Sequence, residues 1–186
     1  MGPPGAGKGT QARFVADRFG IPAVSTGDIF RANVSEGTDL GIQAQHYMDQ
    51  GEYVPDEVTN LMVRRRIDEA DAVRGFLLDG YPRTLAQVEE LDGMIVFTGH
   101  RLDAVVVLTV DSEEIVQRLL QRSMVEGRAD DTEDVIRRRQ ELYAEQTAPL
   151  IGVYRDRGLL VEIDGMGEVG DVTTRIFTSL DDIPQS

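Results

Sequence analysis

A glycine-rich stretch near the start of the chain has the composition of a phosphate-binding loop. Its glycines allow backbone N–H groups to turn toward phosphate oxygens, and a following helix adds its positive N-terminal end. Lys8 is the only lysine among 19 basic residues, and its compact ammonium suits nucleotide phosphates better than a planar guanidinium. The spacing is that of a Walker A loop, except that Gly9 stands between Lys8 and the hydroxyl residue. A plain Gly/Pro-rich turn is the alternative. The predicted phosphate ligands are Gly5, Ala6, Gly7, Lys8, Gly9 and Thr10.

A second group of chemically capable residues follows an apolar run that ends in Leu77-Leu78. The next residues are Asp79, Gly80, Tyr81, Pro82 and Arg83. Ligands of open α/β sheets bind at the carboxyl ends of strands. An arginine fork can hold a phosphate there, and a carboxylate can serve a magnesium ion. An ordinary strand–turn–helix connection explains the glycine and the proline, but it does not explain Asp79 together with Arg83.

A third group consists of arginines in the second half of the chain. Arg118 and Arg122 are four residues apart and therefore share one helix face. Arg128 and Arg139 follow them. Such a clamp suits phosphoryl transfer, because its transition state spreads negative charge over several oxygens. A solvated helix face is the alternative, and we expect it for Arg138 and its neighbour Arg137.

The elements that must position these residues alternate between short apolar runs and longer amphipathic stretches. We predict strands at 21–25, 75–79, 104–110 and 159–164. We predict helices at 8–19, 27–36, 40–50, 56–71, 84–97, 112–123, 132–157 and 168–180. This alternation is typical of an α/β fold with a parallel sheet and helices on both faces. Thr26 is expected to cap the helix that follows it.

The length and composition limit which kinds of protein this chain can be and which partners it can bind. A length of 186 residues suits a single domain, here 1–186. The formal net charge of −14 argues against a nucleic-acid partner. We see no apolar run long enough for a membrane span and no secretory signal. The absence of cysteine excludes disulfides and cysteine-bound zinc, and it fits a cytoplasmic location.

Taken together with Gln11, residues 25–31 and residues 78–87, the phosphate loop resembles that of adenylate kinases and of their relatives, the UMP/CMP kinases. The resemblance covers almost the whole chain. It implies a P-loop kinase fold with an AMP-binding insertion at 26–55 and a short lid at 122–131. It further implies a monomer that transfers a phosphoryl group from Mg²⁺-ATP to AMP, giving two ADP, without zinc.

The resemblance assigns roles to individual residues. It places Arg118, Arg122 and Gly167 on ATP, and Asp79 with Asp28 on magnesium through water. Lys8, Arg83, Arg118, Arg122, Arg128 and Arg139 are the implied catalytic residues. The implied AMP ligands are Thr26, Arg31, Glu52, Tyr53, Val54, Gly80, Tyr81, Pro82, Arg83, Gln87, Arg128 and Arg139. UMP/CMP kinases typically carry alanine where this chain has Thr26, which favours AMP; a UMP/CMP kinase remains the alternative.

One departure from the family pattern concerns the start of the sheet. In the family an apolar strand leads into the phosphate loop and lies centrally in a five-stranded sheet, whereas only Met1 precedes Gly2. We expect the natural chain to begin upstream, and we expect a gap between two strand edges without that strand. Unpaired buried backbone groups cost about 1–3 kcal/mol each, so a nucleotide-binding but inactive form is a further alternative.

Overall fold

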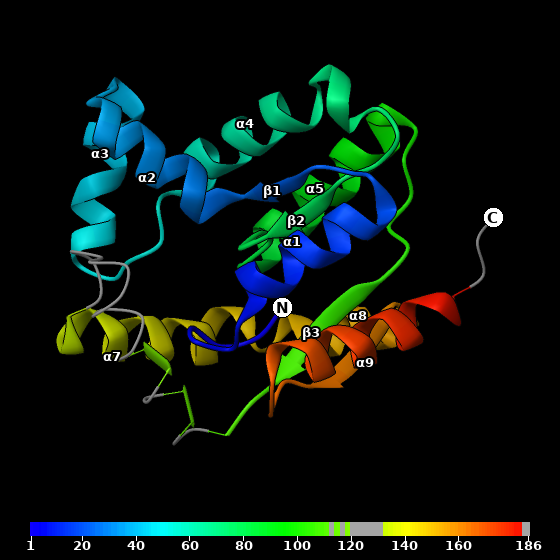
Figure 1. Ribbon diagram of the computed structural model, residues 1–186. Helices are drawn as coiled ribbons and strands as arrows, with labels where there is room; N and C mark the ends of the chain where they lie inside the picture. The colour runs from blue at the N-terminus through cyan, green and yellow to red at the C-terminus, as the bar shows by residue number, and fades with distance from the viewer. Residues whose placement is uncertain (112–113, 116–117, 120–131, 184–186) are drawn as a thin grey trace.

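The computed structural model describes residues 1–111, 114–115, 118–119 and 132–183. Its strands form two separate parallel pairs (Figure 1). In the first pair β1 (Ala23–Ser25) lies beside β2 (Leu77–Asp79), with Ala23 opposite Leu77. In the second pair β3 (Val105–Thr109) lies beside β4 (Leu160–Asp164), with Val105 opposite Leu160. The parallel α/β architecture predicted from the sequence is confirmed.

Helices connect and cover the two strand pairs (Figure 1). Several of them end at a glycine with positive φ, among them α1 at Gly20 and α5 at Gly99, as glycine-capped helices do. Their bounds are α1 Lys8–Phe19, α2 Thr26–Glu36, α3 Asp39–Asp49, α4 Asp56–Ile67, α5 Leu85–Thr98, α7 Glu133–Leu142, α8 Leu150–Asp156 and α9 Val169–Asp181; a 3₁₀ turn covers Ala70–Ala72. The predicted helix at 112–123 lies mostly outside the described residues.

Each strand pair has its own hydrophobic core. Around β1 and β2, α4 and α5 bury Val63 and Leu91 together with Phe30 from α2. Around β3 and β4, α1 and α9 bury Val15 and Ile176. Because α1 also contacts β2 and α9, it bridges the two halves of the molecule.

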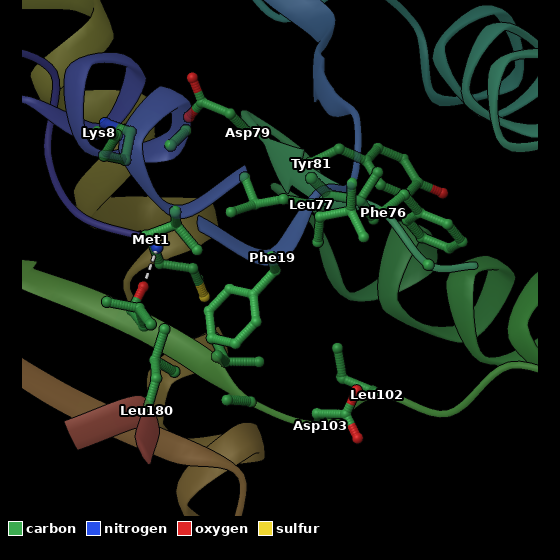
Figure 2. A pocket seen from close by; sticks show the side chains of 18 of the residues that line it. Met1, Lys8, Phe19, Phe76, Leu77, Asp79, Tyr81, Leu102, Asp103 and Leu180 are labelled. Carbon is green, nitrogen blue, oxygen red and sulfur yellow. Dashed lines mark hydrogen bonds between the residues drawn. The ribbon is translucent and has the colours of Figure 1, made fainter. Parts of the chain in front are cut away.

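A cavity of about 720 Å³ lies between β2 and β3. Figure 2 shows Lys8 and Asp79 at one end of it and Leu102 at the other, with apolar side chains such as Leu77 between them. Met1 lies at its edge: its amine donates to Val106 O, and Leu108 N donates to Met1 O at 3.0 Å, as a parallel neighbour of β3 would. The gap expected between two strand edges is therefore present.

The helix predicted at 132–157 is wrong in one respect, because it is interrupted. After α7 a π-helical turn, η2, covers Tyr143–Thr147, and Ala148 N donates to Tyr143 O at 2.8 Å. Pro149 follows and precedes α8. Proline lacks an N–H donor, so it cannot continue the hydrogen-bond ladder of the preceding helix and serves better at a helix start.

Candidate active site

The glycine-rich loop runs from the edge of β3 into the N-terminus of α1. At Gly2, which has φ +137°, an added Cβ would lie 2.7 Å from Leu108 O, so only glycine fits against the strand there. The Lys8 ammonium donates to Gly2 O at 2.8 Å and to Pro3 O at 2.9 Å. The lysine is thus folded over its own loop, at the N-terminus of a helix whose dipole favours an anion.

Asp79 ends β2 beside this loop. A Cβ added to Gly9 would lie 3.4 Å from Asp79 Oδ2, so the carboxylate faces the first turn of α1. Magnesium is commonly held by one or two carboxylates together with phosphates and water, and Asp79 fits that requirement. In the described parts of the chain, no three or more histidine, aspartate or glutamate side chains gather at one point. Asp28 forms an ion pair with Arg31 on the same helix.

Gly80 joins the loop after β2 to the start of α2. Its carbonyl accepts from Thr26 Oγ1 at 3.0 Å and from Arg83 Nε at 2.7 Å. Gly80 has φ +79°, and an added Cβ would lie 2.7 Å from the Thr26 hydroxyl oxygen. The expected cap at Thr26 is wrong: α2 begins at Thr26, one residue earlier than a Thr26 cap requires, and Ser25 Oγ accepts from Asp28 N at 3.3 Å instead.

Arg83 is surrounded by charges of both signs. Its guanidinium carbon lies 4.9 Å from the centre of the Tyr53 ring. Burial lowers the pKa of Arg83, Tyr53 and Asp79 oppose that shift, and the positive charges of Arg139 and Arg31 add to it. Cations that lower one another's pKa are stabilised by an anion placed between them, so this group suits a phosphate.

Arg31 approaches the same region from α2. Its guanidinium lies over Gly27, where an added Cβ would be 3.1 Å from either terminal nitrogen. Arg139 lies on α7, in the part of the chain that follows the predicted lid. The structure therefore brings together three of the predicted phosphate-binding arginines, Arg31, Arg83 and Arg139.

The side chain of Gln87 is buried and already hydrogen-bonded within the protein. It is only 2% exposed. Its Oε1 accepts from Arg83 N at 2.7 Å, and its Nε2 donates to Asp56 Oδ1 at 2.6 Å. Thr84 donates to the other oxygen of Asp56 at 2.7 Å. The amide therefore holds the loop after β2 against the start of α4, and contact with an adenine stays a prediction.

Tyr81 and Val54 lie inside the protein, at 5% and 7% exposure, and Pro82 is also buried. The Tyr81 hydroxyl donates to Asn60 Oδ1 at 2.8 Å, and burial raises the pKa of Tyr81 well above its ordinary value. The side chains of these residues therefore pack in the protein interior and support the segment from inside. Contact of this segment with AMP stays a prediction.

The loop before α4 contacts α7, which is distant in the sequence. Arg138 Nε donates to Glu52 Oε1 at 2.7 Å, and a Cβ on Gly51 would lie 2.8 Å from Val135 O. Figure 1 shows the chain between α3 and α4 reaching down toward α7. Arg138, which we expected on a solvated face, is therefore partly buried in an ion pair. Amphipathic periodicity alone could not predict this partner.

Two further arginines organise the loop after β4. Arg118 donates to Gly165 O at 3.1 Å and to Glu114 Oε1 at 2.8 Å. Arg175 Nη1 donates to Asp164 O at 2.8 Å and to Met166 O at 2.7 Å, directly before Gly167. These bonds fix the segment predicted to meet the ATP base. Arg122 and Arg128 lie outside the described residues.

Several polar side chains tie neighbouring elements to the site. Gln11 Nε2 donates to Val169 O at 3.0 Å, which ties α1 to α9. Gln140 Nε2 donates to Pro4 O at 3.2 Å, which ties α7 to the phosphate loop. Thr147 Oγ1 donates to Arg83 O at 2.9 Å, which ties the segment after α7 to the loop after β2. No sequence pattern marks the contact of Thr147 with Arg83, because the two residues are 64 positions apart.

Comparison with known proteins gives a consistent result. The family model described as adenylate kinase matches residues 1–159. A protein of a Nocardioides species named adenylate kinase is 76% identical over 186 residues, covering 100% of this chain and 97% of its own. Namesakes from Kocuria rhizophila and Thermobifida fusca are 58% and 57% identical; each match covers 97% of this chain, and 96% and 95% of those proteins. Within the described residues, no helix is both long and apolar enough to cross a membrane.

Proposed function

The chain belongs to the adenylate kinase family, and from that premise we propose that it transfers the terminal phosphoryl group of Mg²⁺-ATP to AMP reversibly, giving two ADP. The observation that carries this proposal is the meeting of two phosphate sites at one end of β2. Asp79 ends the strand beside the loop of Lys8, and four residues later Arg83 lies within electrostatic reach of Asp79, Arg31 and Arg139. A donor phosphate and an acceptor phosphate can therefore be held side by side.

The chemistry requires no nucleophilic side chain. An oxygen of the AMP phosphate attacks the γ-phosphorus in line, and the bond from that phosphorus to the β–γ bridging oxygen breaks. The loop N–H groups and Lys8 stabilise charge on the donor side, and Arg83 with Arg139 stabilises it on the acceptor side. Catalysis then depends on positioning and on fixed positive charge rather than on general acid–base steps.

Magnesium fits the donor side of this arrangement. Asp79 would hold the hydrated ion, with Asp28 as a helper on α2. When bound, the ion neutralises charge on the β- and γ-phosphates. The role of Lys8 remains distinct, because its ammonium donates hydrogen bonds directly from the loop.

Four finer assignments belong to the same proposal. Residues 26–55 are the AMP-binding insertion, and the short lid expected at residues 122–131, which would exclude water as a competing acceptor, lies outside the described residues. The protein acts as a monomer. A mass larger than that of one chain, measured by light scattering during size-exclusion chromatography, would contradict this. The protein acts in the cytoplasm, as the absence of cysteine suggests; its recovery in an extracytoplasmic fraction would count against this.

The decisive experiment measures ADP formation by the purified 186-residue chain. Mg²⁺-ATP is the donor, and AMP, UMP and CMP are offered separately as acceptors. We expect turnover with AMP to exceed turnover with the pyrimidine nucleotides by at least about tenfold, because a site built for one base leaves polar groups unpaired with another.

A preference for UMP or CMP would mean that the acceptor site has been misread and would favour the UMP/CMP kinase alternative. Inactivity with every acceptor, combined with normal ATP binding, would favour the nucleotide-binding but inactive alternative. A Lys8→Met sample prepared in parallel serves as the background for contaminating kinases.

A further inference from the structure

Three residues from distant parts of the chain form a hydrogen-bonded series that ends at Arg83, the arginine on the acceptor side. Tyr53 precedes α4, Arg83 follows β2, and Thr147 closes the π-helical turn after α7. The Tyr53 and Thr147 hydroxyl oxygens are 2.9 Å apart. Thr147 Oγ1 is also 2.9 Å from Arg83 O, and Thr147 is only 6% exposed.

The direction of both hydrogen bonds follows from the inventory of protons. The Arg83 carbonyl can only accept, so the Thr147 hydroxyl donates its single proton there. The hydroxyl oxygen then serves as an acceptor, and the Tyr53 hydroxyl must donate to it. The series therefore runs from Tyr53 through Thr147 to the main chain of Arg83.

Tyr53 contacts Arg83 a second time through its ring. The guanidinium carbon lies 4.9 Å from the ring centre, within the range of cation–π attraction. The backbone and the guanidinium of Arg83 are thus both held by the same pair of side chains. A third constraint comes from Gly80, whose carbonyl accepts from Arg83 Nε at 2.7 Å.

The π-helical turn explains how Thr147 reaches Arg83. Such a turn inserts one residue into a helix, which rotates everything after it by about 100° relative to an uninterrupted helix. Since α7 carries Arg139 and leads directly into η2, Thr147 also ties the helix of Arg139 to the loop of Arg83. π-turns are frequent at functional sites, where such an adjustment is retained.

We propose that Thr147 is a positioning residue for the acceptor phosphate: its hydroxyl fixes the main chain of Arg83 and its distance from α7, with Tyr53 as the donor that orients that hydroxyl. The inference rests on the proposed function, in which Arg83 holds the phosphate of AMP. Neither hydroxyl touches the reacting atoms in this assignment.

The test uses variants that separate the hydroxyl from the shape of residue 147. Thr147→Val keeps the branched side chain and removes the hydroxyl, whereas Thr147→Ser keeps the hydroxyl. KM for AMP, KM for ATP and kcat are measured for each, together with the Kd of AMP by calorimetry in the absence of ATP. We expect Thr147→Val to raise KM and Kd for AMP about tenfold, because it leaves a buried carbonyl unpaired, with KM for ATP changed less than about twofold.

Thr147→Ser should restore the AMP values to within about threefold of those of the original chain, since the hydrogen-bonded series is intact. Tyr53→Phe should raise the Kd of AMP about threefold in the original chain and leave it unchanged in the Thr147→Val background, where the acceptor is already lost. This lack of additivity would indicate that Tyr53 acts through the Thr147 hydroxyl. A general loss of stability would not produce it.

Unchanged AMP values in Thr147→Val would overturn the inference. So would equal losses for ATP and AMP that serine fails to restore, since that pattern denotes a purely structural residue. If the original chain binds AMP but turns over no acceptor, the proposed function fails while the calorimetric comparison still decides the role of Thr147. If it binds no AMP at all, both are refuted.

Discussion

At the scale of single residues, the phosphate loop and the acceptor site use different types of cation. Lys8 lies within the phosphate loop, where a compact ammonium donates to Gly2 O and Pro3 O. Arg83 lies in the loop after β2 and Arg31 lies on α2, and the planar guanidinium of each can bind two phosphate oxygens. The use of a lysine at one site only is therefore chemically selective in a chain with 19 basic residues.

Replacement of Lys8 by methionine removes the ammonium and keeps a similar length of side chain. We expect Lys8→Met to lower kcat by about 100- to 1,000-fold or more, since a preorganised charged donor is lost from the transition state. Steady-state assays with AMP and Mg²⁺-ATP measure this. Arg65→Met, which removes an exposed cation, is the matched control and should change kcat less than about twofold. Near-normal turnover in Lys8→Met would contradict the assigned role.

Replacement of Arg83 by alanine should separate the two nucleotides. A hydrogen bond to a charged group contributes about 1.5–3 kcal/mol, so KM for AMP should rise roughly 10- to 100-fold in Arg83→Ala. KM for ATP should change by less than about threefold, because Lys8 and its loop are untouched. Steady-state kinetics with each nucleotide varied in turn measure both values. Equal losses for ATP and AMP would remove Arg83 from the acceptor side; Arg65→Ala serves as the control for charge.

At the scale of elements, the sequence predicts well what depends on local pattern. The apolar run at Val105–Leu108 predicts a buried strand, and β3 spans Val105–Thr109. The start of α1 at Lys8 and the end of α5 near Gly99 follow from glycine positions. Site residues that follow different strands, such as Thr26 after β1 and Asp79 at the end of β2, are likewise brought together because the carboxyl ends of parallel strands share one edge.

What depends on distant partners is not predictable in this way. The π-helical turn at Tyr143–Thr147 interrupts a sequence whose amphipathic period continues, so nothing local marks it except the proline that follows. The bonds of Thr147 to Arg83 and of Arg138 to Glu52 join elements 64 and 86 residues apart. The helix cap at Ser25 depends on where β1 ends, which tertiary pairing with β2 decides.

Helix α5 offers a test of how the first core is stabilised. Leu91 is 2% exposed among the core side chains around β2, whereas Leu85 on the same helix is 57% exposed. We expect Leu91→Ala to lower the free energy of unfolding by about 2–5 kcal/mol, from lost burial and the cavity left behind. Leu85→Ala, the matched control, should cost less than about 0.5 kcal/mol. Urea titration followed by circular dichroism measures both, and similar costs would show that α5 is not packed as described.

At the scale of the whole molecule, the dominant feature is an excess of negative charge. The chain has 33 acidic and 19 basic residues, for a formal net charge of −14. Ion pairs such as Arg18–Asp181 and Arg155–Glu162 are largely exposed, with side chains 38–58% accessible. Exposed pairs contribute only about 0–1 kcal/mol each, so they do not offset the repulsion among the remaining carboxylates.

This balance predicts the response of stability to salt. Raising sodium chloride from about 0.01 M to 0.5 M shortens the screening length from roughly 30 Å to below 10 Å, which weakens long-range repulsion more than contact pairs. We expect Tm to rise by a few degrees, because a change of about 1 kcal/mol shifts Tm by roughly 2–4 °C in a protein of this size. Differential scanning calorimetry at constant pH, without nucleotide, measures the shift.

The control for general solvent effects is sucrose at matched osmolality, which stabilises by exclusion from the protein surface and leaves Coulombic interactions unscreened. The salt effect should exceed the sucrose effect and level off once the screening length falls below the spacing of neighbouring charges. A fall in Tm with salt would mean that attraction within the ion pairs outweighs the repulsion among carboxylates. The Arg138–Glu52 contact between α7 and the loop before α4 would then be the first pair to remove, because it joins the two sides of the acceptor site.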